Sequence, residues 1–272
     1  MIKPPLKWAG NKFRVLPHLL PLIGTPTRYC EPFGGSLSVA LNVGADEYIL
    51  NDVNKDLVHL YQYLTGPEDV THEFLQYFTM EVNTEESFYA LRTTFNATTD
   101  INEKTKLFVY LNRHCFNGLT RYNKKGEFNV PFGKYKSPYF PQKELLEFRS
   151  YFLSRKLVRF ISLSFEDVSL YENLQSGDVV YFDPPYIPAS DTSNFTSYAT
   201  DGFTHDQQIQ LRDLAESLAN RGIKVILSNH DVPVARELYK NAEIYAIQVS
   251  RSIAANKESR KKANELIAVW QP

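Results

Sequence analysis

The amino-acid sequence predicts an α/β protein in which a parallel sheet is interrupted by a mostly helical insertion. Short apolar segments alternate with helical patterns before residue 55 and again after residue 157, as in sheets built from strand–helix–strand units. Residues 55–145 show helical patterns instead, and no Gly/Ser-rich linker or internal repeat divides the chain. We therefore expect one discontinuous domain over 1–54 plus 146–272 and a second domain over 55–145.

The N-terminal segment predicts a strand–helix–strand unit that follows an opening helix. Its elements, in chain order, are a helix over 13–22 limited by two prolines, a strand over 27–31, a short helix over 36–43 and a strand over 48–50. The glycines of EPFGGS at 31–36 separate the first strand from the short helix, as expected of a turn between a strand and a helix.

The insertion and the C-terminal part have different patterns. Helices are expected over 57–64, 70–78, 85–95 and 104–113, before a polar, aromatic and basic stretch with turn signals over 118–141. Strands are then expected over 158–162, 179–182, 224–227, 244–249 and 265–270, with helices over 206–220 and 233–239. The alternation in this last part indicates that the chain returns to the sheet.

The composition is that of a folded chain long enough to bury a sizeable core. Of the 272 residues, 43% are hydrophobic and 22% charged, which disfavours both disorder and a membrane protein. The N-terminus has no apolar segment of the kind found in signal peptides, so we expect a cytoplasmic protein. Cys30 and Cys115 lack the spacing of metal or redox motifs, and no metal site is expected.

The formal net charge of −1 conceals a segregation of charge along the chain. Acids dominate residues 46–103, whereas bases dominate residues 1–14, 113–136 and 251–262. The three basic stretches could converge on one face as a footprint for phosphates. They could equally be three solvated surfaces, and charge alone favours that interpretation.

The stretch EPFGGS is the first candidate for a binding site. A strand that runs into glycines and then a helix lets the backbone and free amides approach a nucleotide-like ligand. Asp52 follows the second strand about seventeen residues after Gly35, a spacing at which an acid binds ribose hydroxyls. Gly34 and Gly35 alone favour a tight turn, and Asp52 could be an exposed strand end. Together they favour a ribose-bearing cofactor, while the absence of GxGxxG disfavours a nicotinamide.

The stretch GDVVYFDPPY at 177–186 is the second candidate. A buried strand delivers Asp183 to the edge where parallel sheets bind ligands, and two prolines with fixed φ follow it. A carboxylate and a nearby carbonyl are the two acceptors that a planar amino group needs, and Tyr186 can stack on the ring carrying that amine. A bare Asp-Pro-Pro would favour a turn closing a strand. The aromatic residue and the buried strand favour a site that acts on an amino group.

These two motifs resemble those of amino-group DNA methyltransferases that use S-adenosylmethionine. Further stretches similar to the Dam family of DNA adenine methyltransferases are LKWAGNK at 6–12, LNRHCFNGLTRYNKKGEFNVPFGKYK at 111–136, SNFTSY at 193–198 and LSNHD at 227–231. The resemblance covers nearly the whole chain, in the order of the α class. It implies a Rossmann-like methyltransferase sheet, with residues 55–145 as an inserted, mostly helical DNA-recognition domain.

The resemblance also implies a role for each matching residue in catalysis and cofactor binding. Asp183 and Pro184 would accept the N6 hydrogens of an extruded adenine, with Pro185 completing the rigid step and Tyr186 stacking on the base. The residues implied in binding S-adenosylmethionine are Trp8, Lys12, Phe33, Gly35, Asp52 and Asp183. Taken alone, Trp8 could be a buried anchor and Lys12 a solvated lysine. Leu37 stands where the family usually has a glycine, which puts the path of this loop in question.

The implied DNA target is the duplex sequence GATC. Lys7 and Tyr135 would read the outer guanine, and Arg121 the guanine of the last base pair. The remaining implied contacts are Leu119 and Pro131 on the thymine methyl, Phe116 and Asn117 as a wedge beside the flipped base, and Lys134 at a position often held by arginine. Each of these residues alone would favour a packed or solvated role. No obligate protein partner is implied.

Two alternatives remain open at this point. A relative acting on RNA or on protein glutamine would commonly have Asn in place of Asp183 and no use for the basic, aromatic stretch at 113–136. A DNA-binding protein with a degenerate site would not need an intact Asp183–Tyr186 motif together with Asp52 and the glycines.

Overall fold

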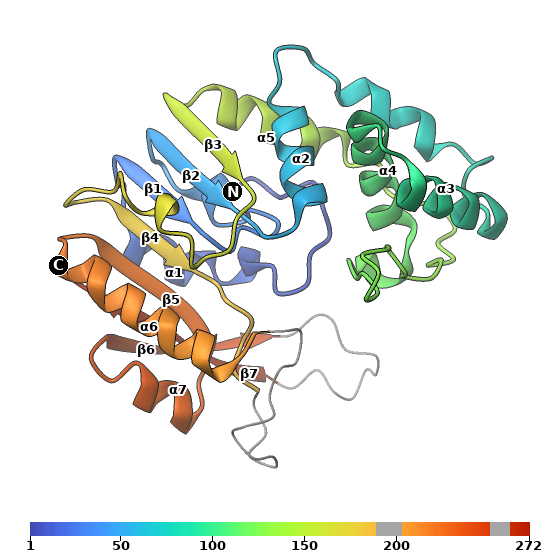
Figure 1. Ribbon diagram of the computed structural model, residues 1–272. Coiled ribbons are helices and arrows are strands. Elements are labelled where there is room, and N and C mark those ends of the chain that lie inside the picture. Colours follow the sequence, from blue (N-terminus) through green and yellow to red (C-terminus); the bar gives the residue numbers. More distant parts are fainter. Residues whose placement is uncertain (189–202, 251–261) are drawn as a thin grey trace.

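A seven-stranded sheet forms the centre of the molecule in the computed structural model, which describes residues 1–188, 203–250 and 262–272 (Figure 1). The strands are β1 (Arg28–Glu31), β2 (Glu47–Asn51), β3 (Leu157–Ile161), β4 (Val179–Phe182), β5 (Lys224–His230), β6 (Glu243–Ser250) and β7 (Lys262–Trp270). Their order is β3-β2-β1-β4-β5-β7-β6, and only β7 runs antiparallel to its neighbours β5 and β6 among pairs that are otherwise parallel. The predicted Rossmann-like sheet is confirmed.

The central strands are buried on both faces, which explains their continuous apolar sequences. Along β1, Tyr29 contributes to one hydrophobic cluster and Cys30 to the other; along β4, Tyr181 and Phe182 are divided in the same way. The chain passes from β1 outward to β2 and β3, and then returns to β4 beside β1. The order of the sheet therefore reverses between β1 and β4, which is where such sheets bind ligands.

Helices from different parts of the chain cover the two faces. The first cluster includes apolar side chains of α1 (Leu16–Ile23), α2 (Lys55–Leu64) and α5 (Gln142–Leu153), whereas the second includes those of α6 (His205–Asn220) and α7 (Pro233–Leu238). Helix α5 was not predicted, although Phe148 and Phe152 contact Phe160 of β3. Only a narrow stripe of this helix is apolar, and the polar residues between its apolar positions weaken the helical pattern in the sequence.

The insertion forms a helical lobe on the side of the molecule opposite α6 and α7 (Figure 1). It contains the 3₁₀ segment η3 (Thr71–Phe78), α3 (Glu85–Ala97) and α4 (Ile101–His114). Beyond α4, isolated bridges join Cys115 to Phe132 and Tyr122 to Phe128, so residues 115–132 form a short hairpin. The predicted division at 55 and 145 stays a prediction; helix α5 spans its second boundary.

The predicted helix over 36–43 is wrong. The chain makes turns there and only a three-residue 3₁₀ segment, Ala40–Asn42. The Gly34 N–H donates to the Asn51 carbonyl at 2.7 Å, and Leu37 has a φ of 56°, so the backbone leaves the helical region. A φ in this left-handed region favours glycine, the residue that the resemblance implies at this position.

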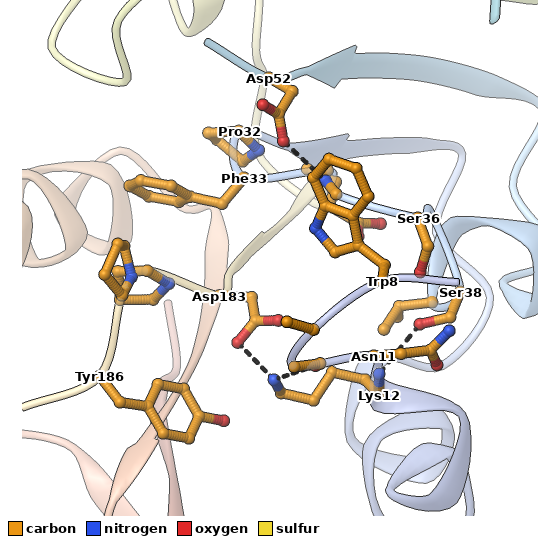
Figure 2. Close-up of a pocket in the computed structure, with 18 of the residues that line it drawn as sticks. Trp8, Asn11, Lys12, Pro32, Phe33, Ser36, Ser38, Asp52, Asp183 and Tyr186 are labelled. Carbon is orange, nitrogen blue, oxygen red and sulfur yellow. Dashed lines mark hydrogen bonds and ion pairs between the residues drawn. The ribbon is translucent and has the colours of Figure 1, made fainter. Parts of the chain in front are cut away.

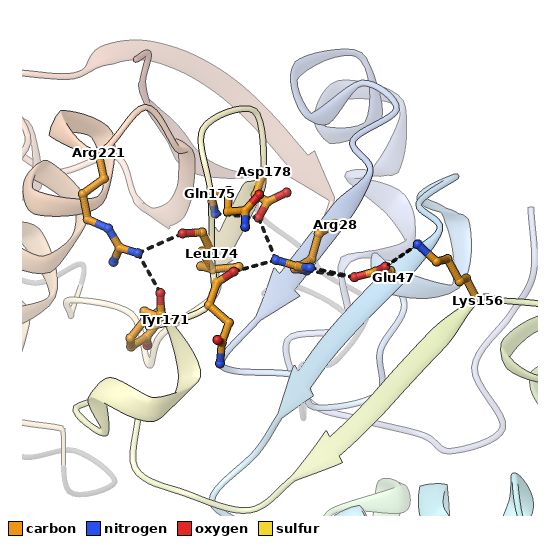
Figure 3. A network of polar contacts seen from close by, with 9 residues as sticks. Arg28, Glu47, Lys156, Tyr171, Leu174, Gln175, Asp178 and Arg221 are labelled. Atoms are coloured by element: carbon orange, nitrogen blue, oxygen red, sulfur yellow. Dashed lines mark hydrogen bonds and ion pairs between the residues drawn. The ribbon is translucent and has the colours of Figure 1, made fainter.

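A polar network ties the amino ends of the strands together (Figure 3). The Arg28 guanidinium donates to Glu47 at 2.8 Å and contacts Asp178 at 3.4 Å, and Lys156 reaches Glu47 at 3.0 Å. The network therefore joins the starts of β1, β2, β3 and β4. These ion pairs lie at the edge opposite the ends of β1 and β4, and they fix the alignment of the strands that deliver the site.

Candidate active site

A cleft of about 870 Å³ opens at the carboxyl ends of β1, β2 and β4. Its lining includes all nine of the residues singled out for catalysis or cofactor binding: Trp8, Lys12, Phe33, Gly35, Asp52, Asp183, Pro184, Pro185 and Tyr186. The register of the parallel strands explains this convergence, because Glu31, Asn51 and Phe182 end neighbouring strands at the same edge. Sequence positions far apart thus form one site (Figure 2).

Asp52 and the glycine loop form one side of the cleft. The Gly35 N–H donates to Asp52 Oδ2 at 2.8 Å and the Asn54 N–H to Asp52 Oδ1 at 2.9 Å. A Cβ at Gly35 would lie 2.7 Å from Nε1 of Trp8, so the absence of a side chain lets the indole pack directly on the loop. The amides that a helix N-terminus was expected to present therefore serve partly to hold Asp52.

Asn51 fixes the two loops that flank Asp52. Its side-chain amide donates to the carbonyls of Pro32 at 2.8 Å and Leu163 at 3.1 Å, and it accepts the Leu163 N–H at 2.9 Å. The side chain is almost fully buried, so it cannot exchange these partners for water. The loops after β1 and β3 are held at fixed positions on either side of β2.

An aromatic wall lies beside the glycine loop. The ring of Phe33 is 5.3 Å from that of Phe165 and 5.8 Å from that of Phe203 between centroids. All three residues line the cleft. Such a wall suits a flat, apolar ligand group.

Lys12 connects the N-terminal segment to the DPPY motif (Figure 2). Its ammonium lies 2.8 Å from Asp183 Oδ1 and 4.7 Å from the centre of the Tyr186 ring, and it donates to the Gly10 carbonyl at 2.7 Å. An N–H cation thus already contacts the carboxylate and the aromatic face that the sequence predicts for an amine substrate.

Polar side chains from β5, α6 and β7 hold the DPPY loop. Gln208 donates to the Pro185 carbonyl at 2.8 Å, and Asn229 accepts the Ile187 N–H at 2.9 Å. The Tyr186 hydroxyl donates to Glu265 at 3.1 Å. Among the residues that the structure describes, none donates to the Pro184 carbonyl.

Burial controls the acid groups of the site. It raises the pKa of Asp183 above the ordinary range, and the charge and hydrogen bond of Lys12 oppose that rise. Burial likewise raises the pKa of Asp52, opposed by the two backbone N–H groups. Burial raises the pKa of Glu31 to about 8, although Glu31 accepts from the Tyr29 hydroxyl and the Ala40 N–H.

Two of the predicted DNA-reading residues contact each other. The Lys7 ammonium lies 4.3 Å from the centre of the Tyr135 ring. The buried side chain of Asn112 binds both backbone groups of Lys7, accepting its N–H at 2.9 Å and donating to its carbonyl at 2.7 Å. Gly118 packs directly on the Lys7 side chain. The peptide bond between Lys7 and Trp8 therefore joins this pair to the wall of the cleft.

The other predicted DNA-reading residues lie on or beside the hairpin 115–132. Phe116, Asn117, Arg121, Pro131 and Lys134 are exposed, and Leu119 is half-buried. Arg121 donates from Nε to the Asn129 side chain at 2.7 Å, and Lys134 lies 3.8 Å from Glu85. The Phe116 N–H donates to the Pro131 carbonyl at 2.8 Å, which brings the predicted wedge and a predicted thymine contact together.

Some sequence observations lie outside the described residues. These are the stretch SNFTSY at 193–198 and all but the last residue of the basic stretch 251–262. Within the described residues, no group of three or more His, Cys, Asp or Glu side chains could hold a metal ion. No helix in that part of the chain has the length and apolar character needed to cross a membrane.

Sequence reasoning missed five residues that shape the cleft: Phe165, Phe203, Gln208, Asn229 and Glu265. Only Asn229 carried a signal, since it lies in the LSNHD stretch quoted for the resemblance. The other four carried no signal, because their place beside the cleft depends on the order of the strands in the sheet, which the local sequence does not reveal.

Comparisons with known proteins agree on one family. Residues 8–253 match the family model described as D12 class N6 adenine-specific DNA methyltransferase. A DNA adenine methylase of Vibrio cholerae serotype O1 is 43% identical over 271 residues, covering 98% of this chain and 95% of that protein. A DNA adenine methylase of Escherichia coli K12 is 42% identical over 271 residues with the same coverage.

Two solved structures are more distant. A precorrin 8W decarboxylase of Methanobacterium thermoautotrophicum is 7% identical with a TM-score of 0.39, covering 95% of this chain and 89% of its own. A methyltransferase domain titled delta-N METTL16 MTase domain is 10% identical with a TM-score of 0.39, covering 97% and 84%. Both scores lie below 0.5, and the fold assignment rests on the strand order.

Glu31 provides a test of the burial at this edge. With a folded pKa of about 8 against an ordinary 4.5, Glu31 keeps a proton that the unfolded chain releases within this range of pH. Its contribution to stability is thus fully present below pH 4.5 and is lost as pH rises toward 8, by up to about 1.4 kcal/mol per pH unit. Glu31→Gln should remove this loss, so its urea midpoint should fall less than that of the wild type between pH 5 and pH 8.

The exposed Glu68 supplies the control, because Glu68→Gln changes the same group where water solvates it. Equal pH dependence in wild type and Glu31→Gln would contradict the buried, protonated Glu31.

Proposed function

Since this chain belongs to the D12 class of N6 adenine-specific DNA methyltransferases, as a relative of the DNA adenine methylases, we propose that it transfers the methyl group of S-adenosylmethionine to adenine N6 in duplex GATC. The observation that carries the proposal is the cleft itself, where Asp183 and Tyr186 face the loop formed by Gly35 and Asp52. One side offers acceptors for an amine, and the other offers an acid at a ribose-binding position. We expect the enzyme in the cytoplasm, where DNA is available to it.

The residues present fit S-adenosylmethionine. Each oxygen of Asp52 accepts one backbone N–H and keeps lone-pair capacity for a ribose hydroxyl. Trp8 and Phe33 provide apolar walls, Gly35 lets them approach the backbone, and Lys12 and Asp183 supply charges at the far end of the cleft. When bound, S-adenosylmethionine supplies an electrophilic methyl group on sulfur.

The DPPY loop is built to hold an amino group. Adenine must leave the duplex because its N6 is otherwise paired within the stack. The Asp183 carboxylate and the Pro184 carbonyl accept the two N6 hydrogens, and Tyr186 stacks on the base. Two acceptors on the hydrogens position the nitrogen and draw its lone pair out of conjugation with the ring, so that it can attack an electrophile in the rest of the cleft. The Lys12 ammonium opposes the rise in the pKa of Asp183 that burial causes, and so favours the charged form that the accepting role requires.

Target recognition falls to residues 55–145 together with Lys7. Lys7 and Tyr135 read the outer guanine, and Arg121 reads the guanine of the last pair. Leu119 and Pro131 contact the thymine methyl, while Phe116 and Asn117 fill the space of the flipped base. Lys134 contacts a phosphate or a base, more weakly than the arginine often found at this position would. The contacts of Lys7 with Tyr135 and Gly118 support this proposal, because Lys7 directly precedes Trp8 in the wall of the cleft.

The experiment that tests this proposal measures transfer of a labelled methyl group from S-adenosylmethionine to two duplexes, one containing GATC and the other GTTC. We expect label at adenine N6 in the first duplex only, and we expect Asp183→Ala to abolish transfer while cofactor binding survives. Label on both duplexes would refute the roles assigned to the DNA-reading residues. Label on neither, with DNA bound, would indicate a non-catalytic DNA-binding protein, and substantial turnover by Asp183→Ala would refute its role.

Gly35→Ala tests the cofactor loop. The new Cβ would lie 2.7 Å from Nε1 of Trp8, so the indole must move, and binding of S-adenosylmethionine measured by calorimetry should weaken at least several-fold. Gly177→Ala is the matched control, because Gly177 also has a left-handed φ, of +90°, but nothing lies within 4 Å of its new Cβ. Comparable weakening by both variants would show that backbone strain, and not the Trp8 contact, matters.

Arg121→Ala tests base reading. The substitution should cost about 1–3 kcal/mol in discrimination at one base pair, measured as kcat/KM on GATC relative to a duplex changed at the last pair. An equal loss on every duplex would make Arg121 a phosphate contact instead.

A further inference from the structure

Arg121 is exposed on the hairpin 115–132, so its position depends on what holds that hairpin. Across the hairpin, Asn129 accepts from Arg121 Nε at 2.7 Å, and its N–H donates to the Arg121 carbonyl at 3.1 Å. These bonds fix the side chain within the hairpin. They leave open how the hairpin is placed relative to the sheet.

The next residue supplies that placement. The Tyr122 hydroxyl donates to Asp56 Oδ2 at 2.7 Å, and Lys104 of α4 contacts Asp56 Oδ1 at 3.2 Å. The Tyr122 ring meets that of Phe128 edge-on at 6.0 Å. Burial, with the nearby Asp56 carboxylate, raises the pKa of Tyr122, so its hydroxyl stays a donor.

Asp56 in turn is joined to the edge of the cleft. It lies in the first turn of α2, whose N-cap Asn54 accepts the Leu57 N–H at 3.2 Å. The Asn54 N–H donates to Asp52 Oδ1 at 2.9 Å. One helical turn therefore separates the carboxylate that lines the cleft from the carboxylate that holds the hairpin.

We propose that Tyr122, held by Asp56, is a positioning residue that sets where Arg121 meets the base pair it reads. The inference rests on the proposed function. A bidentate contact with guanine O6 and N7 requires both guanidinium donors within hydrogen-bond range, so a small shift of the hairpin removes one of them. Neither Tyr122 nor Asp56 touches the DNA in this role.

The chain contains its own control for the chemistry of this contact. Tyr63 donates to Glu73 at 3.0 Å, and Lys106 of α4 lies 3.0 Å from the same carboxylate oxygen. This second Tyr–carboxylate–Lys cluster involves α2, η3 and α4 but no residue of the hairpin. Tyr63→Phe therefore removes an equivalent hydrogen bond without releasing Arg121.

The experiment compares kcat/KM on three hemimethylated duplexes, in which the target adenine of the opposite strand already carries an N6-methyl group, so that only the named strand accepts a methyl group. The named strands are GATC, GATT with the last pair changed, and AATC with the first pair changed. Tyr122→Phe should lower the GATC/GATT ratio of kcat/KM about 3- to 10-fold. This is the fold-change that corresponds to the net free energy of one hydrogen bond, here the bond that holds the hairpin in place. The GATC/AATC ratio, which depends on Lys7 and Tyr135, should stay unchanged. Tyr63→Phe should change neither ratio.

Variants of Asp56 complete the test. Asp56→Asn keeps an acceptor for the Tyr122 hydroxyl and should retain most of the GATC/GATT ratio, whereas Asp56→Ala should lose it. Both ratios falling together, or Tyr63→Phe matching Tyr122→Phe, would overturn the positioning role. If the wild-type protein transfers no methyl group to GATC, the proposed function itself is refuted. If the wild type prefers GATC to GATT and Tyr122→Phe has the same GATC/GATT ratio, only this inference is refuted.

Discussion

The ion pair between Lys12 and Asp183 is the constraint on which the arrangement of the site depends. A carboxylate buried at the end of β4 requires a compensating charge, and the chain supplies it from its first twelve residues. Holding Lys12 there draws the N-terminal segment across the carboxyl ends of the strands. Trp8 then rests on Gly35, and Lys7 reaches Asn112 and Tyr135. The N-terminal segment thus supplies the charge that neutralises Asp183, a wall of the cleft and a residue proposed to read DNA.

The second half of the arrangement is the attachment of the helical lobe. Helix α2 follows β2 directly and packs on both the sheet and α4, so it belongs to both parts of the molecule. Its first turn joins Asp52 to the hairpin through Asp56. The lobe is therefore attached to the sheet through α2, and the hairpin is held relative to β2, the strand that ends at the cleft.

The sequence predicts the strands well because they are short, apolar and bounded by turns, and β1, β2 and β4 lie within a residue or two of their predicted positions. It fails over residues 36–43, where Leu37, Ala40 and Leu41 have helical spacing but are buried by a series of turns, with a left-handed φ at Leu37. Tertiary packing overrides local pattern there. Asp52 and Asp183 could be found because strand ends converge. Phe203 and Glu265 could not, because only the sheet order brings them to the cleft. The approach of Lys7 to Tyr135 came from family resemblance alone.

The Lys12 ammonium has a consequence for selectivity. Because it is tethered beside Asp183 and Tyr186, it acts as an internal competitor present at an effective concentration on the order of millimolar or more. An N–H donor that binds Asp183 must therefore share the carboxylate with the tethered ammonium, which penalises small amines that make few other contacts in the cleft.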